Sequence, residues 1–202
     1  MNSSPLKIAV LLSGSGRTLQ NFLDEKAAGR LDVSIERVIS SRADVLGVQR
    51  ARDAGISTQI INPQQCGEIF DLIDQANIDL VCLAGWMCFL EIPARYSGRV
   101  MNIHPALLPA FGGKGMYGAK VHQAVLDYGC KITGCTVHFV TNEYDAGPII
   151  LQRTCPVLED DDAHTLADRV FAEEKKAYPD ALRLFAAGRL KIEGRRVRIS
   201  SR

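Results

Sequence analysis

Long hydrophobic runs are missing from this chain. No stretch of about 18 consecutive apolar residues occurs in its 202 residues, so we predict no membrane-spanning helix. The run Leu6–Leu12 is too short for the core of a secretion signal. A surplus of one charge is missing too, because 24 basic and 23 acidic residues leave a formal net charge of +1. We therefore expect neither nucleic acid nor a membrane surface as a partner.

The cysteines lack the Cys-x-x-Cys spacing that is typical of metal and redox motifs. Cys82 lies in an apolar segment and Cys135 among β-forming residues, so we expect free, buried thiols in a cytoplasmic protein. Histidine is scarce, with four residues in the chain. The spacing of His104, His138 and Asp145 matches no zinc pattern, and we expect no bound metal.

What the sequence does contain is an alternation of valine- and isoleucine-rich runs with helical patterns. In the first half it predicts strands at 7–12, 33–39, 58–61, 80–84 and 99–103, with helices at 16–28, 45–54 and 67–76. In the second half it predicts a glycine-rich loop at 111–115, a helix at 120–128, antiparallel strands at 133–140 and 148–158, a helix at 163–187 kinked or interrupted near Pro179, and a hairpin of 190–192 with 196–199.

These elements predict an α/β fold. We expect a Rossmann-like, mostly parallel twisted sheet with helices on both faces, followed by antiparallel strands and a long helix towards the carboxyl end. A chain of this length fits one domain over 1–202, with a parallel half at 1–105 and a closing half at 106–202.

Two polar side chains stand where the fifth predicted strand ends. Asn102 and His104 are two residues apart, so they project from the same face of a strand. Pro105 and Pro109 then hold a turn. The carboxyl ends of strands in open α/β sheets are where ligands bind. An amide beside an imidazole suits stabilisation of an oxyanion, although His104 could also be a hydrogen-bonded core histidine.

A glycine loop follows the first predicted strand and opens the first helix, with the residues Gly14, Ser15, Gly16, Arg17 and Thr18. Glycines let backbone N–H groups approach an anion, and a helix N-terminus favours negative charge. The loop lacks the third glycine of a dinucleotide fingerprint and the lysine of a P-loop, so a single phosphate fits better. A tight turn that needs small residues explains the same pattern equally well.

Asp145 lies in a turn between two strand-like segments. Placed against His104, its carboxylate would favour the imidazolium and raise the pKa of His104, whereas the alternative is a turn-forming aspartate bonded to its own backbone. His138 is expected to be a hydrogen-bonded strand histidine, although it could face the site. His122 and His164 fall on helical patterns and are expected on the surface.

The sequence resembles the phosphoribosylglycinamide formyltransferase family over nearly all of residues 6–192. Family motifs occur in order at 13–16, 83–87, 102–109, 136–140 and 145–149. The segment Asn102–Pro109 marks the wider formyltransferase group. The resemblance implies transfer of a formyl group from 10-formyltetrahydrofolate to a phosphorylated glycinamide in purine synthesis, without metal, in a cytoplasmic monomer or weak homodimer.

Site residues follow from the same resemblance. Asn102, His104 and Asp145 match the family's catalytic residues. Residues Gly14 to Thr18 and Glu174 match positions that bind the substrate. The folate pocket would be lined by Met87, Cys88, Phe89, Leu90, Asn102, Thr141, Asn142, Glu143, Tyr144 and Asp145.

The chain departs from the family where its folate tail would bind. Cys88 stands where many members have arginine, and the segment 63–68 is shortened and lacks another. Gly112 replaces a common proline, which suggests a looser loop. Two other functions stay open: formyl transfer to another amine, such as methionyl-tRNA or a sugar nucleotide, and a nucleotide-binding module without chemistry. In the last case Asn102, His104 and Asp145 would not converge.

Overall fold

A computed structural model describes residues 4–62 and 67–201 of the chain. The chain forms two compact units, which are separated between Met101 and Asn102, inside the strand β5 (Val100–His104). The expected single domain with halves at 1–105 and 106–202 stays a prediction.

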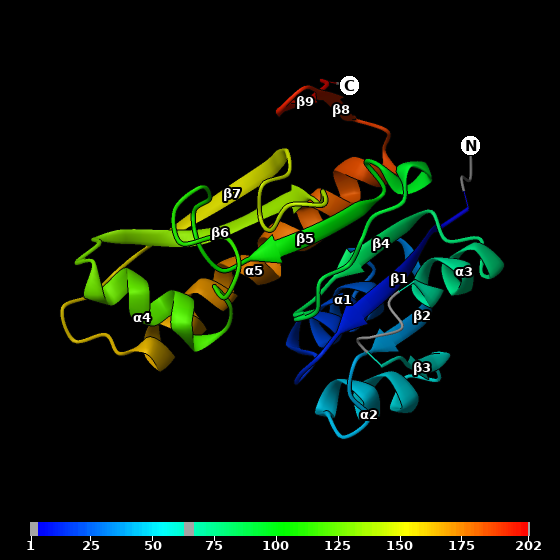
Figure 1. The fold of residues 1–202 in the computed structure, drawn as a ribbon, viewed down its shortest axis with the longest axis horizontal. Helices are drawn as coiled ribbons and strands as arrows, with labels where there is room; N and C mark the ends of the chain where they lie inside the picture. The colour runs from blue at the N-terminus through cyan, green and yellow to red at the C-terminus, as the bar shows by residue number, and fades with distance from the viewer. Residues whose placement is uncertain (1–3, 63–66, 202) are drawn as a thin grey trace. The chain divides into compact units, whose positions relative to one another are not determined.

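The first unit is a parallel α/β layer with the strand order β3-β2-β1-β4, and β5 begins beside β4 (Figure 1). The pairs of β1 with β2 and β4, and of β2 with β3, are parallel. Its elements are β1 (Leu6–Leu12), α1 (Arg17–Ala27), β2 (Val33–Ser40), α2 (Leu46–Asp53), β3 (Thr58–Ile60), α3 (Glu68–Gln75), β4 (Leu80–Leu83) and the short 3₁₀-helix η2 (Ala94–Tyr96).

The apolar runs form the centre of this unit. All five residues from Ile8 to Leu12 are fully buried, and so are Leu80 to Cys82 in the neighbouring β4. A strand that is buried on both faces carries no polar alternation, which is why these segments read as continuous hydrophobic runs. Burial therefore places the polar functional groups beyond the carboxyl ends of the strands.

The second unit contains the rest of β5 and has the strand order β5-β6-β7-β9-β8. The strands β6 and β7 are antiparallel, and β8 and β9 form a hairpin whose Arg196 lies beside Ile149 of β7. The long helix α5 packs against β6 and β7. The elements of this unit are α4 (Ala119–Asp127), β6 (Ile132–Phe139), β7 (Ile149–Pro156), α5 (Ala163–Ala186), β8 (Leu190–Glu193) and β9 (Arg196–Ile199).

The helix α5 is not interrupted near Pro179, which was one of the two expected alternatives. It runs without interruption through Pro179 over 24 residues. Its amino end is fixed by a capping box, in which the Asp162 side chain accepts from the backbone N–H of Thr165. Around Pro179, Tyr178 and Leu182 are fully buried. Tertiary packing thus outweighs the local loss of one helical hydrogen bond.

The predicted α/β class, the mostly parallel sheet, the antiparallel strands and the long helix near the carboxyl end are confirmed. Five cysteines are free thiols: Cys82, Cys135 and Cys155 are buried, whereas Cys88 and Cys130 are half-buried rather than buried. Cys66 lies outside the described residues.

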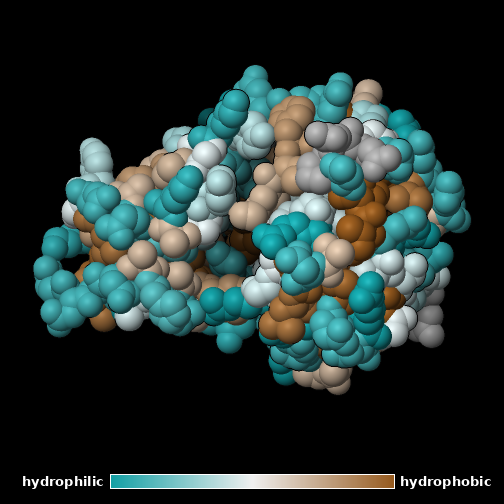
Figure 2. All heavy atoms as spheres, turned by 60° about the horizontal axis from the view of Figure 1, so that its bottom comes forward, coloured by the Kyte–Doolittle hydropathy of each residue, from teal (hydrophilic) through white to brown (hydrophobic). Residues whose placement is uncertain are grey.

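None of the helices in the described part of the chain has the length and apolar character needed to span a bilayer. On the face shown in Figure 2, hydrophobic patches interrupt a largely hydrophilic surface.

Candidate active site

In the first unit, Ser13 ties three loops together just beyond the strands. Its backbone N–H donates to the Gly85 carbonyl (3.0 Å), and its hydroxyl accepts from the Met87 N–H (3.0 Å) and the Ser41 hydroxyl (2.7 Å). Ser13 itself is buried. One side chain therefore fixes the loops after β1, β2 and β4 relative to one another.

The glycine loop enters α1 through a left-handed residue. Gly16 has φ 70° and ψ 30°, and a Cβ there would lie 2.6 Å from the Cα of Gly47. Both facts require glycine, so the tight-turn interpretation explains Gly16 in full. No side-chain hydrogen bond caps the start of α1, while Ser15 and Arg17 are exposed. The geometry is compatible with an anion at this helix end, which stays a prediction.

The predicted folate residues of the first unit follow β4. Met87 and Phe89 are 53% and 46% exposed, which is unusual for large apolar side chains, whereas Cys88 is half-buried and Leu90 is buried. Exposed apolar groups can contact an aromatic ligand. Their role as lining residues stays a prediction.

In the second unit, β5 ends at His104 and brings Asn102 and His104 onto one face, as their spacing predicts. The turn that follows is held by Thr136 of β6, which is fully buried. Its hydroxyl donates to the Ala106 carbonyl (2.7 Å) and accepts from the Leu108 N–H (3.0 Å). The turn is thus fastened to the neighbouring strand.

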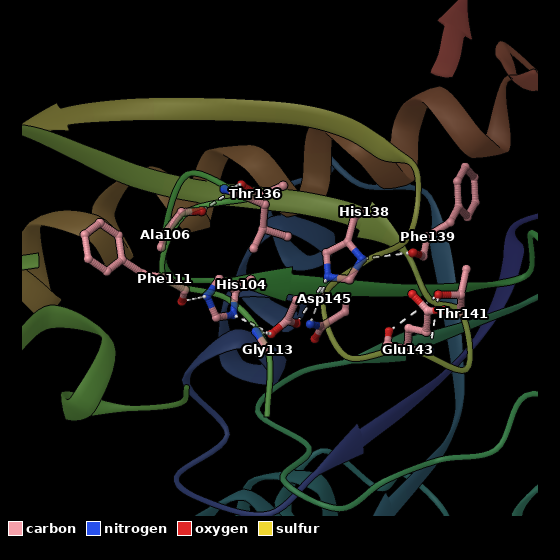
Figure 3. Close-up of polar contacts among 12 residues, drawn as sticks. His104, Ala106, Phe111, Gly113, Thr136, His138, Phe139, Thr141, Glu143 and Asp145 are labelled. Atoms are coloured by element: carbon pink, nitrogen blue, oxygen red, sulfur yellow. Dashed lines mark hydrogen bonds and ion pairs between the residues drawn. The ribbon is translucent and has the colours of Figure 1, made fainter. Parts of the chain in front are cut away.

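His104 lies between a carbonyl and a carboxylate (Figure 3). Its Nε2 lies 2.8 Å from the Phe111 carbonyl oxygen, and its Nδ1 lies 3.6 Å from Oδ2 of Asp145. A carbonyl can only accept, so Nε2 carries a proton. In the neutral ring Nδ1 then turns a lone pair towards the carboxylate, and protonation of Nδ1 converts that repulsion into an ion pair.

The expected rise in the pKa of His104 is wrong. Burial lowers this pKa and outweighs Asp145 and the Phe111 carbonyl, which both raise it; His138 lowers it further. The net pKa therefore lies below the usual value of histidine. Burial therefore favours the neutral imidazole in the unliganded protein.

The carboxylate of Asp145 faces two imidazoles instead of its own turn. Gly113 N–H donates to Oδ2 (2.9 Å), and Nε2 of His138 lies 3.7 Å from Oδ1. Burial alone would raise the pKa of Asp145, but His138, His104 and the Gly113 N–H outweigh burial and hold it below its usual value. The group is therefore an anion between two histidines.

His138 belongs to this cluster as well as to its strand. Its Nδ1 donates to the Phe139 carbonyl (2.9 Å), and its Nε2 accepts from Nδ2 of Asn102 (3.2 Å). The contact with Nε2 orients the Asn102 amide and uses one of its two N–H groups. A usable signal was present in the sequence, because the i, i+2 spacing of Thr136 and His138 predicts one shared strand face.

Other functional atoms were not predictable from residue types. The Phe111 carbonyl and the Gly113 N–H are backbone groups of the loop after the turn. Thr141, Asn142, Glu143 and Tyr144 are exposed, and their predicted contact with folate stays untested.

The structure also places Glu174, a predicted substrate residue, and His122, which was expected on the surface. Glu174 of α5 is half-buried, and burial followed by the Glu174 charge raises the pKa of Cys135 to about 12. Glu174 therefore lies close to β6, and its predicted contact with substrate stays untested. His122, expected on the surface, is buried because the face of α4 that carries Val121 and Val125 packs inward.

No group of three or more His, Cys, Asp or Glu residues within 4–62 and 67–201 could hold a metal ion. The cluster formed by Asn102, His104, His138 and Asp145 supplies one amide donor and a histidine–carboxylate pair.

Comparison with known proteins gives the family. A family model described as formyl transferase matches residues 6–182. The phosphoribosylglycinamide formyltransferase of Escherichia coli (strain K12) is 38% identical over 196 residues, which cover 93% of this chain and 90% of that protein. The chain belongs to the phosphoribosylglycinamide formyltransferases of the formyl transferase family.

Solved structures of the phosphoribosylglycinamide formyltransferases agree with this assignment. Glycinamide ribonucleotide transformylase 1 from Symbiobacterium toebii matches with a TM-score of 0.91 and 44% identity, over 99% of this chain and 96% of that one. The human trifunctional purine biosynthetic protein adenosine-3 is 40% identical over 195 residues, which cover 92% of this chain. The chain spans about a fifth of the length of such trifunctional relatives.

Proposed function

We propose that this protein transfers a formyl group from 10-formyltetrahydrofolate to the amine of 5′-phosphoribosylglycinamide, a step of de novo purine synthesis. The observation that carries the proposal is the cluster at the end of β5, where the Asp145 carboxylate lies 3.6 Å from His104 and 3.7 Å from His138. Relatives named for this activity support the choice of both substrates.

The chemistry needs a stabilised oxyanion. The substrate amine attacks the formyl carbon, and the carbonyl electrons move onto the formyl oxygen. The second N–H of Asn102 donates to that oxygen, and the positive charge of protonated His104, whose ring nitrogens face Phe111 and Asp145, stabilises it electrostatically. When the carbonyl reforms, the bond to the folate nitrogen breaks, and that nitrogen gains the proton that the amine loses. Metal is not required for this sequence of steps.

The low pKa of His104 gives the cluster selectivity for the transition state. A group that is neutral before reaction and charged beside the oxyanion stabilises the intermediate more than the bound substrates. Asp145 supplies the negative charge that makes this protonation favourable. We therefore assign Asp145 to the control of His104 rather than to direct attack.

The substrate phosphate would bind at Gly14–Thr18, where α1 begins without a side-chain cap. The folate would contact Met87–Leu90 of the first unit. In the second unit we expect Thr141–Asp145 to contact folate and Glu174 to contact the substrate. Cys88 lacks the charge that many members of the family provide, and the segment 63–66 lies outside the described residues. A cytoplasmic monomer or weak homodimer stays a prediction.

The direct test is an assay with glycinamide ribonucleotide and 10-formylfolate, which follows the absorbance change as the formyl group leaves. We expect turnover with this acceptor and none with methionyl-tRNA or an amino-sugar nucleotide. Turnover with another acceptor alone would contradict the proposed substrate but would still support formyl transfer as the reaction.

The control for the cluster is His104→Ala, in which we expect turnover to be lost while the fold persists. A non-catalytic module predicts no turnover in either protein. That alternative also predicts that His104 and Asp145 lie apart, whereas Nδ1 of His104 is 3.6 Å from Oδ2 of Asp145.

A further inference from the structure

Tyr128 is a large aromatic residue that core packing does not explain. It follows α4 directly and is 81% exposed. Its ring meets the ring of Phe111 at an edge-on angle of 78°, with the centroids 5.9 Å apart. Edge-to-face pairs at this distance attract each other beyond the burial of their surfaces.

Phe111 connects this surface contact to the buried cluster. Its backbone has φ 54°, a left-handed conformation that is unfavourable for a bulky residue and persists only where the surroundings hold it. Its ring points away from Asp145 while its carbonyl accepts from Nε2 of His104 (Figure 3). The ring contact on one side and the hydrogen bond on the other hold the residue in this conformation.

The same segment also reaches the carboxylate. Two residues after Phe111, the N–H of Gly113 donates to Oδ2 of Asp145 at 2.9 Å. Residues 111–113 therefore contact both members of the pair formed by His104 and Asp145. A shift of this segment would change both contacts together.

We propose that Tyr128 is a positioning residue: by packing against Phe111 it keeps the Phe111 carbonyl on Nε2 of His104 and so holds His104 in the orientation that faces Asp145. This inference rests on the proposed function, in which His104 becomes charged beside the oxyanion. Tyr128 touches no reacting atom and acts only through the loop.

The electrostatics of His104 define what the contact controls. The titratable groups that influence or face it are Asp145, His138 of β6 and His122 of α4. Tyr128 itself is not among these groups, so a change at Tyr128 reaches His104 only through residues 111–113. The Phe111 carbonyl raises the pKa of His104, so loss of this acceptor lowers the pKa further.

The experiment compares Tyr128→Ala with Tyr128→Phe. Nitrogen-15 NMR follows the titration of His104 in the unliganded protein, and steady-state kinetics give kcat and KM across pH. For Tyr128→Ala we expect His104 to titrate at lower pH and kcat to fall roughly two- to tenfold, with both KM values unchanged. Tyr128→Phe keeps the ring and should match the wild type.

Tyr117→Ala is the matched control, because Tyr117 is also an exposed aromatic residue of this region and contacts Lys120 instead of Phe111. Its His104 titration should stay unchanged. A His104 titration that is identical in Tyr128→Ala and the wild type overturns the inference, whatever the rates. If the protein transfers no formyl group, the proposed function fails, and the NMR titration still decides the role of Tyr128.

Discussion

At the scale of single residues, the negative charge of Asp145 is the feature on which the cluster depends most. Three donors or imidazoles surround one carboxylate that is only 13% exposed. An isosteric amide would keep the shape and remove the charge that favours protonation of His104. Such a variant therefore separates the effects of the charge on kcat and on its pH dependence from effects on folding.

For Asp145→Asn we expect kcat to fall roughly 10²- to 10⁴-fold, with KM nearly unchanged. The pKa of His104 falls further, since the Asp145 charge raises it. Because the reaction starts from the neutral ring, the loss of kcat with falling pH should accordingly begin at lower pH than in the wild type. Steady-state kinetics across pH measure both effects. Asp160→Asn, an exposed carboxylate, is the control, and a kcat within twofold of the wild type in Asp145→Asn would contradict the assignment.

Gly112 is a second residue on which the cluster depends. A Cβ at this position would lie 2.5 Å from Cδ2 of Leu108 and 3.2 Å from Cβ of Asp145. Leu108 can give way, but Asp145 must move by a few tenths of an ångström. For Gly112→Ala we expect kcat to fall ~10-fold with the fold intact, because small misplacements of catalytic groups are costly.

The matched control for that variant is Gly67→Ala. Gly67 has an ordinary right-handed helical conformation with no atom near its Cβ position. Equal kcat values for the two variants would show that the space beside Asp145 does not matter.

At the scale of elements, the turn after β5 depends on β6. The Thr136 hydroxyl makes the contacts to Ala106 and Leu108 and also accepts from Nε2 of Gln152 at 2.9 Å. The turn therefore has its position fixed by one buried side chain. A substitution that keeps the shape and removes the hydroxyl tests this directly.

For Thr136→Val we expect a loss of about 2 kcal/mol of folding free energy, since buried polar partners lose their hydrogen bonds. The Tm should fall by roughly 4–8 °C in calorimetry. Thr136→Ser keeps the hydroxyl and should recover most of the loss in Tm. A Thr136→Val protein as stable as Thr136→Ser would indicate that packing alone holds the turn.

At the scale of the whole molecule, the sequence predicts the elements well because burial sets their patterns. The run Ile8–Leu12 reads as a strand buried on both faces and is one. Local rules fail where tertiary packing decides, as at Pro179 inside α5 and at buried His122. The pKa of His104 depends on burial, which residue spacing does not reveal.

The residues of the candidate site also divide into those that local sequence rules predict and those that depend on tertiary packing. The shared face of Asn102 and His104 follows from strand geometry alone. The meeting of β6 and the 140–148 loop with that face depends on the fold of the second unit, so the sequence left Asp145 open between two interpretations. Backbone donors and acceptors such as Gly113 and Phe111 carry no residue-type signal at all.

Buried histidines also make the stability of the whole chain sensitive to acid. The pKa values of His104 and His122 are lowered chiefly by burial. In mild acid the unfolded chain therefore binds more protons at these two residues than the folded chain does. Stability is therefore complete above about pH 6.5, where unfolded histidine titrates, and falls as the pH drops towards the lowered folded values. Depressed carboxylate pKa values, as in Asp145 and Asp180, add a second loss at lower pH.

We expect the Tm to fall by roughly 2–4 °C for each kcal/mol lost as the pH decreases from 7 to 5.5. Replacing the buried imidazole in His122→Leu should flatten this dependence, because the variant lacks a group that takes up a proton on unfolding. Nδ1 of His122 has no hydrogen-bond partner within residues 4–62 and 67–201, so its removal breaks no such bond there. His164→Leu is the matched control, since His164 has a side chain that is 86% exposed. Calorimetry between pH 5.5 and 7.5 compares the three slopes. Equal slopes in His122→Leu and the wild type would locate the acid sensitivity in the carboxylates and in His104 alone.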